Sequence, residues 1–388
     1  MYLYYLLAAI SCWIGIKSLL GGFRFAAYVR CETSRALPDF KPFVSVIAPG
    51  RGLEPGLSDN LRPLLTQDYP RYEVLFVFDA ADDPAIEVVE QLKTAAHIAT
   101  RIIIAGPATD SGQKVHNLRV ATTRVDPESE VLVFVDTDAR PEKQWLKQLV
   151  APLADEELGA SSGYRWFVPE NGGIASRLRS VWNASIASAL GGDRARNFCW
   201  GGSTAIRRNT FDRLAVSDRW RGTVSDDFTI TSILKEAKLP IHFTPNCLVA
   251  SVSDCDFKEL FEFTTRQIKI TRVYASHLWL PLLLGSALFT IVFFGGLILI
   301  SRLPVALLLA LIFVLGATKS FIRFRAVSRV LQTSNLDLLA HLFLWPFASL
   351  LYLYNAIVAG FSRRITWRGI TYELKSPREA VIISRGSE

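Results

Sequence analysis

The 388-residue chain lacks the short sequence motifs of several common enzyme classes. It has no GxxxxGK(S/T) stretch to hold an ATP γ-phosphate and no GxGxxG stretch, because GRGLEPG (50–56) has a different spacing. A kinase and a dinucleotide-dependent enzyme are therefore not expected. Cysteine is also scarce: the five cysteines are scattered, and none forms the CxxC pair that zinc and redox sites use. Unpaired cysteines are typical of a domain in the reducing cytosol.

Signals for nucleic-acid binding are missing as well. The net charge of +7 suits either a nucleic acid or an anionic membrane surface. The chain has no arginine-rich tail and no aromatic RNA-binding motif, so a membrane is the expected partner. The apolar residues are unevenly placed: 1–28 and 277–361 are strongly hydrophobic, whereas 37–276 has the composition of a soluble domain.

The first hydrophobic stretch, MYLYYLLAAISCWIGI, comes before the basic residues near it rather than after them. A cleavable signal peptide has the opposite order. Residues 1–30 are therefore predicted to be a retained membrane anchor, with the domain that follows in the cytosol. This catalytic domain is expected to cover 37–276 and to end in a helix at the membrane interface.

Two further apolar segments predict a transmembrane hairpin over 277–318. LWLPLLLGSALFTIVFFGGLILI (278–300) has 23 residues without a charge, enough to span about 30 Å of hydrocarbon. LPVALLLALIFVLGA (303–317) follows after two residues, which leaves room only for a tight turn.

Residues 319–361 combine a basic stretch, 319–329, with a last hydrophobic segment, 336–361. The basic stretch is expected at the cytosolic face of the membrane. The hydrophobic segment either spans the membrane or re-enters it. Because a single span would place the basic residues of the C-terminal tail, 362–388, outside, we expect a broken or re-entrant helix and a cytosolic tail.

The domain 37–276 alternates apolar strands with amphipathic helices. Strands are expected at 43–52, 72–79, 100–106 and 130–136, and helices at 57–67, 84–95 and 116–124. This alternation predicts an α/β fold in which a doubly wound, mostly parallel sheet has helices on both faces. Ligands of such sheets bind beyond the carboxyl ends of the strands.

Carboxylates follow two of the predicted strands. Asp79 ends VLFVFD, and Asp136 and Asp138 follow VLVFV in the stretch VDTDA. One strand-end aspartate alone is often a turn or helix cap, but acids at the ends of two strands of one sheet favour a shared site. Two carboxylates two residues apart suit Mg²⁺ or Mn²⁺, which keeps coordination positions open for phosphate oxygens. We therefore predict a cation that binds a diphosphate, as in an enzyme that uses a nucleotide sugar.

The chain resembles the ceramide glucosyltransferase family, within the lipid-directed family 2 glycosyltransferases. FVSVIAP and FVFDAADDPAIEVV look like the family's opening strand and first aspartate motif, and VDTDA looks like its second. VSDDF (224–228), after GGSTAIRR (201–208), looks like the third, and RQIKITR (266–272) lies where the family carries (Q/R)xxRW. The resemblance covers almost the whole chain and implies a GT-A-type domain with membrane-anchoring helices at both ends.

The resemblance implies an inverting transfer of a sugar from a UDP-sugar to a lipid hydroxyl such as that of ceramide. Glucose is the first candidate for the sugar. It implies Mn²⁺ or Mg²⁺ as cofactor, a lipid acceptor in the membrane, no nucleic-acid partner and a catalytic domain that faces the cytosol. Asp227 would be the general base, with Arg266 and Lys269 on the departing phosphates, and Asp138 would hold the metal. The implied nucleotide-sugar contacts are Pro49, Asp79, Lys114 and Asp136, and the implied acceptor contacts are Trp200, Gly201 and Gly202.

Two motifs depart from the family's pattern. Lys269 and Ile270 stand where the family has Arg and Trp, so the positive charge is kept but the planar guanidinium and the stacking ring are lost. FDAADDP has one residue more than expected between Asp79 and the acid pair that follows. Asp79 is preferred as the family's first aspartate because it ends the strand, and Asp82 is the alternative.

Structural roles remain open for the same residues. Asp226 and Asp227 could cap the helix expected at 228–238, since Ser and Asp are preferred at that position. Lys114 could be a surface lysine near a helix start, and Trp200 could belong to the core.

The RQIKITR stretch also has two further interpretations, a solvated helix face or a contact with lipid headgroups.

For the whole chain, the alternative within the enzyme class is a hopanoid or polyprenyl-phosphate glycosyltransferase. The alternative outside that class is a catalytically inactive lipid or nucleotide-sugar binding protein. The identity of the sugar, the lipid and the metal, and the oligomeric state, stay open.

Overall fold

The computed structural model describes residues 1–386, and the chain forms two compact units. The helical unit comprises Met1–Cys31, Phe167–Gly191 and Ser253–Ser362, and the sheet unit comprises Glu32–Trp166, Gly192–Val252 and the residues from Arg363 onward. Each unit is built from segments that are far apart in the sequence, and each has a hydrophobic core of its own.

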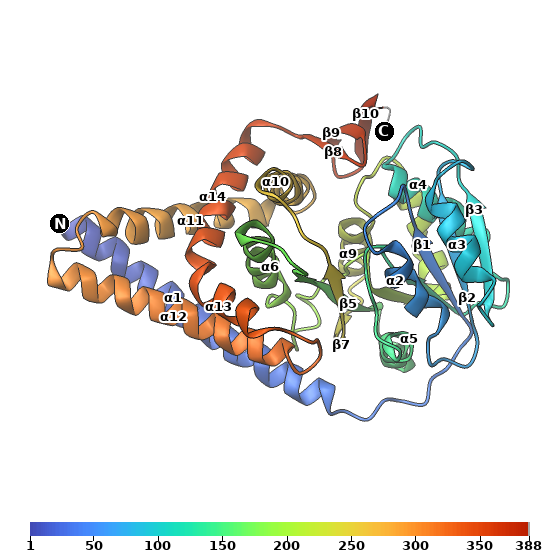
Figure 1. The fold of residues 1–388 in the computed structure, drawn as a ribbon, viewed down its shortest axis with the longest axis horizontal. Helices are drawn as coiled ribbons and strands as arrows, with labels where there is room; N and C mark the ends of the chain where they lie inside the picture. The colour runs from blue at the N-terminus through green and yellow to red at the C-terminus, as the bar shows by residue number, and fades with distance from the viewer. Residues whose placement is uncertain (387–388) are drawn as a thin grey trace. The chain divides into compact units, whose positions relative to one another are not determined.

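Seven strands form the main sheet of the sheet unit, in the order β3-β2-β1-β4-β6-β5-β7 (Figure 1). Their bounds are β1 Val44–Pro49, β2 Tyr72–Phe78, β3 Ala99–Ile104, β4 Val131–Phe134, β5 Ala160–Val168, β6 Thr204–Arg207 and β7 Ile241–Val252. The first four strands are parallel, and β6 runs antiparallel to β4 and β5. Because β5 opposes β6, it shares the direction of the first four strands. The predicted α/β fold with a mostly parallel sheet is confirmed.

Helices cover both faces of this sheet. The helices on one face are α2 (Leu57–Leu61), α3 (Ala85–Lys93) and α5 (Trp145–Val150), with the 3₁₀ turns η1 (Arg62–Leu65) and η2 (Ala151–Ala154). Those on the other face are α4 (Gln113–Thr122), α7 (Arg208–Arg213), α8 (Val216–Arg219) and α9 (Asp226–Glu236). Successive residues of β1 supply the two cores, since Val46 packs on the first face and Ile47 on the second.

The predicted alternation of strands and helices is confirmed from the first strand to the fourth. The helix expected over 57–67 is shorter than predicted, because the α-helix ends at Leu61 and continues as the 3₁₀ turn η1. Pro63 explains the change, since proline has no N–H to donate to the fourth residue before it in an α-helix.

A second, three-stranded sheet follows the last helix and belongs to the sheet unit. It consists of β8 (Arg364–Trp367), β9 (Ile370–Ser376) and β10 (Glu379–Arg385), all antiparallel, and we call it the C-terminal sheet. Arg368 and Gly369 join β8 to β9 with φ angles of 50° and 70°. Positive φ at both residues is what a two-residue hairpin turn requires.

The helical unit contains seven helices within residues 1–386. They are α1 (Tyr2–Thr33), α6 (Ile174–Ala187), α10 (Phe257–Tyr274), α11 (Ser276–Leu297), α12 (Leu303–Val327), α13 (Asn335–Phe343) and α14 (Trp345–Phe361). Three of them, α1, α11 and α12, are long and apolar enough to cross a membrane. The bent pair α13 and α14 meets at 60° and would make a fourth span if it crossed as one.

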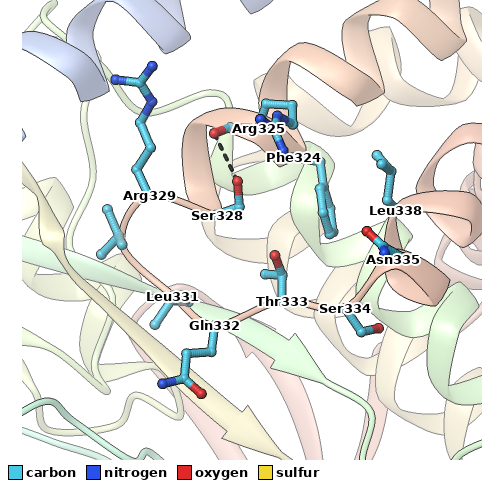
Figure 2. Close-up of a pocket in the computed structure, with 11 residues that line it drawn as sticks. Phe324, Arg325, Ser328, Arg329, Leu331, Gln332, Thr333, Ser334, Asn335 and Leu338 are labelled. Atoms are coloured by element: carbon cyan, nitrogen blue, oxygen red, sulfur yellow. Dashed lines mark hydrogen bonds between the residues drawn. The ribbon is translucent and has the colours of Figure 1, made fainter.

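The three long helices pack against one another within the helical unit (Figure 1). Ala8 of α1, Val292 of α11 and Ile312 of α12 form one buried cluster. Near the middle of α1, the Lys319 ammonium donates to the Ser18 hydroxyl at 2.6 Å. A cavity of about 580 Å³ lies where α12 ends, lined by the loop after α12 and the start of α13 (Figure 2). Arg325 and Arg329 of the predicted basic stretch are among its lining residues.

Candidate active site

The strand-end acids lie at one edge of the main sheet. Asp79 directly follows β2, and Asp136 and Asp138 follow β4. β2 and β4 both pair in parallel with β1, so their carboxyl ends point the same way. Asp79 forms an ion pair with Arg51, which follows the end of β1, at 3.5 Å. The sheet therefore places the predicted acids where α/β proteins bind ligands.

Lys114 connects two of the acidic motifs. It is the second residue of α4, and its ammonium lies 2.7 Å from Asp136 Oδ1 and 3.2 Å from Asp226 Oδ1. The Lys114 side chain is largely buried, so it is not the surface lysine that was one interpretation of the sequence. Its ammonium is held between a carboxylate after β4 and another at the start of α9.

Arg165, on β5, is a residue of the site that the sequence did not predict. Its Nη2 lies 3.1 Å from Asp136 Oδ2 and 2.9 Å from Asp138 Oδ1, so the guanidinium spans both acids of the VDTDA motif. The guanidinium also stands 5.1 Å from the centre of the Trp200 ring. An arginine between the aromatic residues of YRWF was the available signal, because such a residue on a buried strand needs an acidic partner.

Two adjacent acids at the start of α9 have different environments. Ser225 is the N-cap of this helix and accepts a hydrogen bond from the Phe228 amide. Asp227 Oδ1 also accepts from the Phe228 amide, at 2.7 Å, and from the Ser225 hydroxyl. Asp226 is buried, 5% exposed, and faces Lys114. The capping interpretation thus applies to Asp227 and Ser225, and Asp226 belongs to the charged cluster.

Two glycines allow the backbone to approach these carboxylates. A side chain at Gly201 would collide with Asp226 Oδ2, and one at Gly202 would collide with the Trp200 ring and lie 2.8 Å from Asp136 Oδ2. A side chain at Gly201 would therefore shift the Asp226 carboxylate, and one at Gly202 would shift the Trp200 ring. Trp200 is partly buried and packs against the sheet core. The predicted roles of these three residues toward an acceptor stay predictions.

The pKa values in this cluster diverge. Burial alone would raise the pKa of Asp136, but the charges of Lys114 and Arg165 outweigh it and hold the pKa below its ordinary value. For Asp226, burial outweighs the opposing charge of Lys114, and the charges of Asp227 and Asp136 add to the rise, so its pKa is about 6. Burial lowers the pKa of Lys114, yet its two carboxylate partners raise it overall. The cluster therefore combines an ionised carboxylate with one that titrates near neutral pH.

Asp136 and Asp138 have the chemistry of a magnesium or manganese site. Their side chains are 19% and 35% exposed, so both remain partly accessible to solvent. Within residues 1–386, no three His, Cys, Asp or Glu side chains form a metal-binding group. Two carboxylates suffice for these ions when substrate phosphates and water supply the other ligands. Arg165 would have to share the two acids with the cation or move away from them.

Two predicted residues lie in the other unit. Arg266 and Lys269 are on α10, where the Arg266 guanidinium stands 5.6 Å from the centre of the Phe263 ring. Burial lowers the pKa of Lys269. Ile270, which replaces the family's Trp, is buried. Their assignment to phosphate binding stays a prediction.

One family model, described as Glycosyl transferase family 21, matches residues 3–380. The chain is 31% identical to Glycosyltransferase AglE of Haloferax volcanii over 153 residues, and 38% identical to Ceramide glucosyltransferase 1 of Caenorhabditis elegans over 81 residues. These matches cover 38% and 21% of this chain, and 48% and 17% of the two relatives. The chain therefore spans about half, or less, of the length of the curated relatives it matches.

Among solved structures, the chain is similar to the mannosyltransferase PcManGT from Pyrobaculum calidifontis, in complex with GDP-Man and Mn²⁺. That match has a TM-score of 0.48 and 19% identity over 91% of this chain and 98% of the other. A glucosyl-3-phosphoglycerate synthase from Mycobacterium tuberculosis, in complex with Mn²⁺, UDP-glucose and phosphoglyceric acid, matches with a TM-score of 0.38 and 14% identity over 59% and 78% of the chains. At these levels of similarity neither structure says which sugar or cation this chain binds.

Proposed function

The chain belongs to glycosyl transferase family 21, and we propose that it moves a hexose from a UDP-sugar to the hydroxyl of a membrane lipid such as ceramide. Glucose is the first candidate for this hexose. The observation that carries the donor part of this proposal is the charged cluster at the ends of β2 and β4. Asp79, Asp136 and Asp138 lie at one sheet edge, with Lys114 and Arg165 as cations beside them. This arrangement suits a metal-bound diphosphate.

In the proposed reaction, Asp227 takes the proton of the acceptor hydroxyl while the acceptor oxygen bonds to the anomeric carbon. The bond from that carbon to the diphosphate oxygen breaks, and UDP leaves with the electron pair. A single displacement of this kind inverts the configuration of the sugar. The Phe228 amide and the Ser225 hydroxyl hold the Asp227 carboxylate in place. A positioned general base typically contributes about 10²–10⁴-fold to the rate.

Asp226 is the alternative base, since its pKa of about 6 lies near neutral pH. Its carboxylate is buried and paired with Lys114, which leaves it poorly placed to meet an incoming hydroxyl. We therefore assign Asp226 to holding Lys114 and keep Asp227 as the base. Substitution of each acid in turn separates the two roles.

Asp136 and Asp138 are the residues that would hold Mn²⁺ or Mg²⁺, and the cation would neutralise the negative charge that develops on UDP. Lys114 and Arg165 are cations of the chain itself at the same place, and they can donate charge-assisted hydrogen bonds to phosphate oxygens. The remaining predicted contacts are Pro49 and Asp79 for the nucleoside and Arg266 and Lys269 for the diphosphate.

We further propose that α1, α11 and α12 cross the membrane and that the sheet unit faces the cytosol. The basic residues after the first apolar stretch and in 319–329 favour this orientation. Arg325 and Arg329 at the cavity beyond α12 would then lie at the level of the lipid headgroups (Figure 2). A lipid acceptor held in the membrane would reach the site at a raised effective concentration.

The test is an acceptor screen with purified protein. UDP-glucose and other UDP-sugars are incubated with ceramide, a hopanoid or a polyprenyl phosphate, and both UDP release and the mass of the lipid product are measured. We expect UDP release that requires a lipid and a product heavier by one hexose, with an inverted anomeric centre by NMR. Nucleotide binding without lipid-dependent UDP release would instead indicate an inactive binding protein.

A further inference from the structure

The C-terminal sheet contacts three loops of the sheet unit that border elements with predicted site residues, namely β1, α4 and α9. Arg368, in the turn between β8 and β9, forms an ion pair with Glu54 in the loop after β1. Arg385, at the end of β10, donates to the Ala108 carbonyl in the loop after β3 and, at 3.3 Å, to Gln113 Oε1 at the start of α4. Both loops lie beyond the carboxyl ends of parallel strands, where the donor would bind.

Tyr372 of β9 supplies a cap for the helix that presents Lys114. The backbone N–H of Gln113, the first residue of α4, donates to the Tyr372 hydroxyl at 3.1 Å. The first amides of a helix need partners from outside the helix, and the N-cap residue, Gly112, has no side chain to serve. Tyr372 is 2% exposed, so this contact is sealed from water.

The Gln113 side chain holds the loop before α4 in shape. Its Oε1 accepts from the Ala108 amide at 2.9 Å and also from Arg385. Its Nε2 donates to the Gly106 carbonyl and to Asn117, both at 2.9 Å. Two residues of the C-terminal sheet therefore act on Gln113, which is the direct neighbour of Lys114 in the chain.

The third contact is with the loop before α9. Gly222 has a φ of 74°, and a Cβ at this position would collide with the carbonyl of Arg378 between β9 and β10. Only glycine permits so close an approach of the two backbones. The Thr223 carbonyl in turn accepts from the Gly112 amide at 2.8 Å, which joins this loop to the start of α4.

The first loop is also coupled to Tyr372 electrostatically. Burial raises the pKa of the Tyr372 hydroxyl, and the charges of Arg51 and Asp79 add smaller effects of opposite sign. The ion pair at the end of β1 and β2 is therefore close enough to the C-terminal sheet for the two to influence one another. The loop after β1, the loop before α4 and the loop before α9 thus all meet the same small sheet.

We propose that the C-terminal sheet is a structural part of the nucleotide-sugar site, in which Tyr372 and Arg385 are positioning residues that set the start of α4 and hence Lys114. The proposal rests on the proposed function, because it takes the ligand to be a nucleoside diphosphate sugar. Neither residue is assigned a contact with the reacting atoms. They act through Gln113, whose neighbour Lys114 is one of the cations beside the acids.

The experiment measures the affinity of the full-length protein for UDP by calorimetry with Mn²⁺ present. Tyr372→Phe removes only the hydroxyl and keeps the buried ring, and Arg385→Gln removes the cation. We expect each change to weaken UDP binding about three- to tenfold, as the loss of one or two hydrogen bonds implies. The KM for the donor should rise by a similar factor while the KM for the acceptor stays constant, and Arg385→Lys should recover part of the loss.

Matched controls come from the same strand. Glu373 and Lys375 form an ion pair with each other at 3.0 Å, so Glu373→Gln and Lys375→Gln change charge in β9 without touching the three loops. Melting temperatures are recorded for every variant. Unchanged UDP affinity in Tyr372→Phe and Arg385→Gln would overturn the proposal, and so would an equal loss in the two controls, since that would reflect general destabilisation.

A parallel titration with GDP separates this proposal from the proposed function. If the wild type binds GDP and not UDP, the proposed donor is wrong. The ratio between variant and wild-type affinities, measured with GDP, then decides the role of the C-terminal sheet by the same criteria.

Discussion

The two units bury positive charge in different ways. In the sheet unit, Lys114 and Arg165 each contact two carboxylates, so acidic partners compensate both buried cations. In the helical unit, Arg323 of α12 is 3% exposed, and its Nε atom has no hydrogen-bond partner among residues 1–386. Loss of one member of a buried charged pair leaves the other uncompensated. Single substitutions in the paired cluster of the sheet unit should therefore change the chemistry most.

The largest effect is expected from Asp227→Asn in the sheet unit. The change removes the proposed base and keeps the shape of the side chain, so turnover should fall by about 10²-fold or more while UDP binding stays nearly intact. Rates of UDP release in the presence of lipid and calorimetry with UDP measure the two quantities. Asp218→Asn is the matched control, because Asp218 is an exposed acid on α8 of the same unit. A variant that keeps more than about a tenth of the wild-type kcat would transfer the role to Asp226.

The next-largest effect concerns Lys269 of the helical unit. If Lys269 binds the diphosphate, Lys269→Ala should raise the KM for the donor and lower kcat together. Loss of a hydrogen bond to a charged group costs about 1.5–3 kcal/mol, or roughly ten- to a hundredfold in kcat/KM. Lys269→Arg should be tolerated, because it restores the residue that the family carries.

The alternative for Lys269 gives a different result. If α10 only rests on lipid headgroups, Lys269→Ala should leave the kinetics in detergent unchanged. Binding to anionic liposomes should then weaken by about 1 kcal/mol and depend on salt. Unchanged kinetics would remove Lys269 from the site.

A smaller effect concerns the pH dependence of stability. The pKa of Asp226 is about 6 in the folded chain, above the ordinary value of 3.8. A raised pKa means that the folded state holds the Asp226 proton more tightly than the unfolded state does. Protonation of Asp226 therefore stabilises the fold fully below about pH 4, and this stabilisation is lost as the pH rises through about 6. Asp226→Asn stays neutral throughout. Relative to wild type, the variant should gain about 1–3 kcal/mol between pH 4 and pH 8.

Melting curves recorded across this pH range, with a chelator present, check this prediction. The readout is the difference in melting temperature between wild type and variant at each pH, which removes the contributions of other groups. A difference that is constant with pH would mean that Asp226 titrates at its ordinary value.

The predictable part of the site is the part that depends on local sequence. Asp79, Asp136 and Asp138 directly follow β-branched and aromatic runs, and parallel strands bring their carboxyl ends to one edge. A reader of the sequence can therefore place these acids together without knowing the rest of the fold. The lengths of strands and helices were predicted less well, as Pro63 shows in the helix expected over 57–67.

The missed part depends on contacts between segments far apart in the chain. Arg165 reaches Asp136 and Asp138 from β5, a strand that was not predicted. The C-terminal sheet was expected only as a tail, because its short strands gain their burial from packing on the sheet unit. Tyr372 and Gln113, for example, are 259 residues apart. No periodicity or spacing in the sequence indicates such a pairing.

The proposed donor site requires that the acids after β4 bind a cation and that this cation binds the diphosphate. Calorimetric titration of UDP with and without Mn²⁺, on wild type and on Asp138→Ala, tests this claim directly. Asp155→Ala is the control, because Asp155 precedes β5 and so lies toward the opposite edge of the sheet. We expect Mn²⁺ to strengthen UDP binding by wild type and the control, and Asp138→Ala to lose that gain while it keeps the metal-free affinity. An unchanged gain in Asp138→Ala would show that the acids after β4 are structural and would contradict the proposed site.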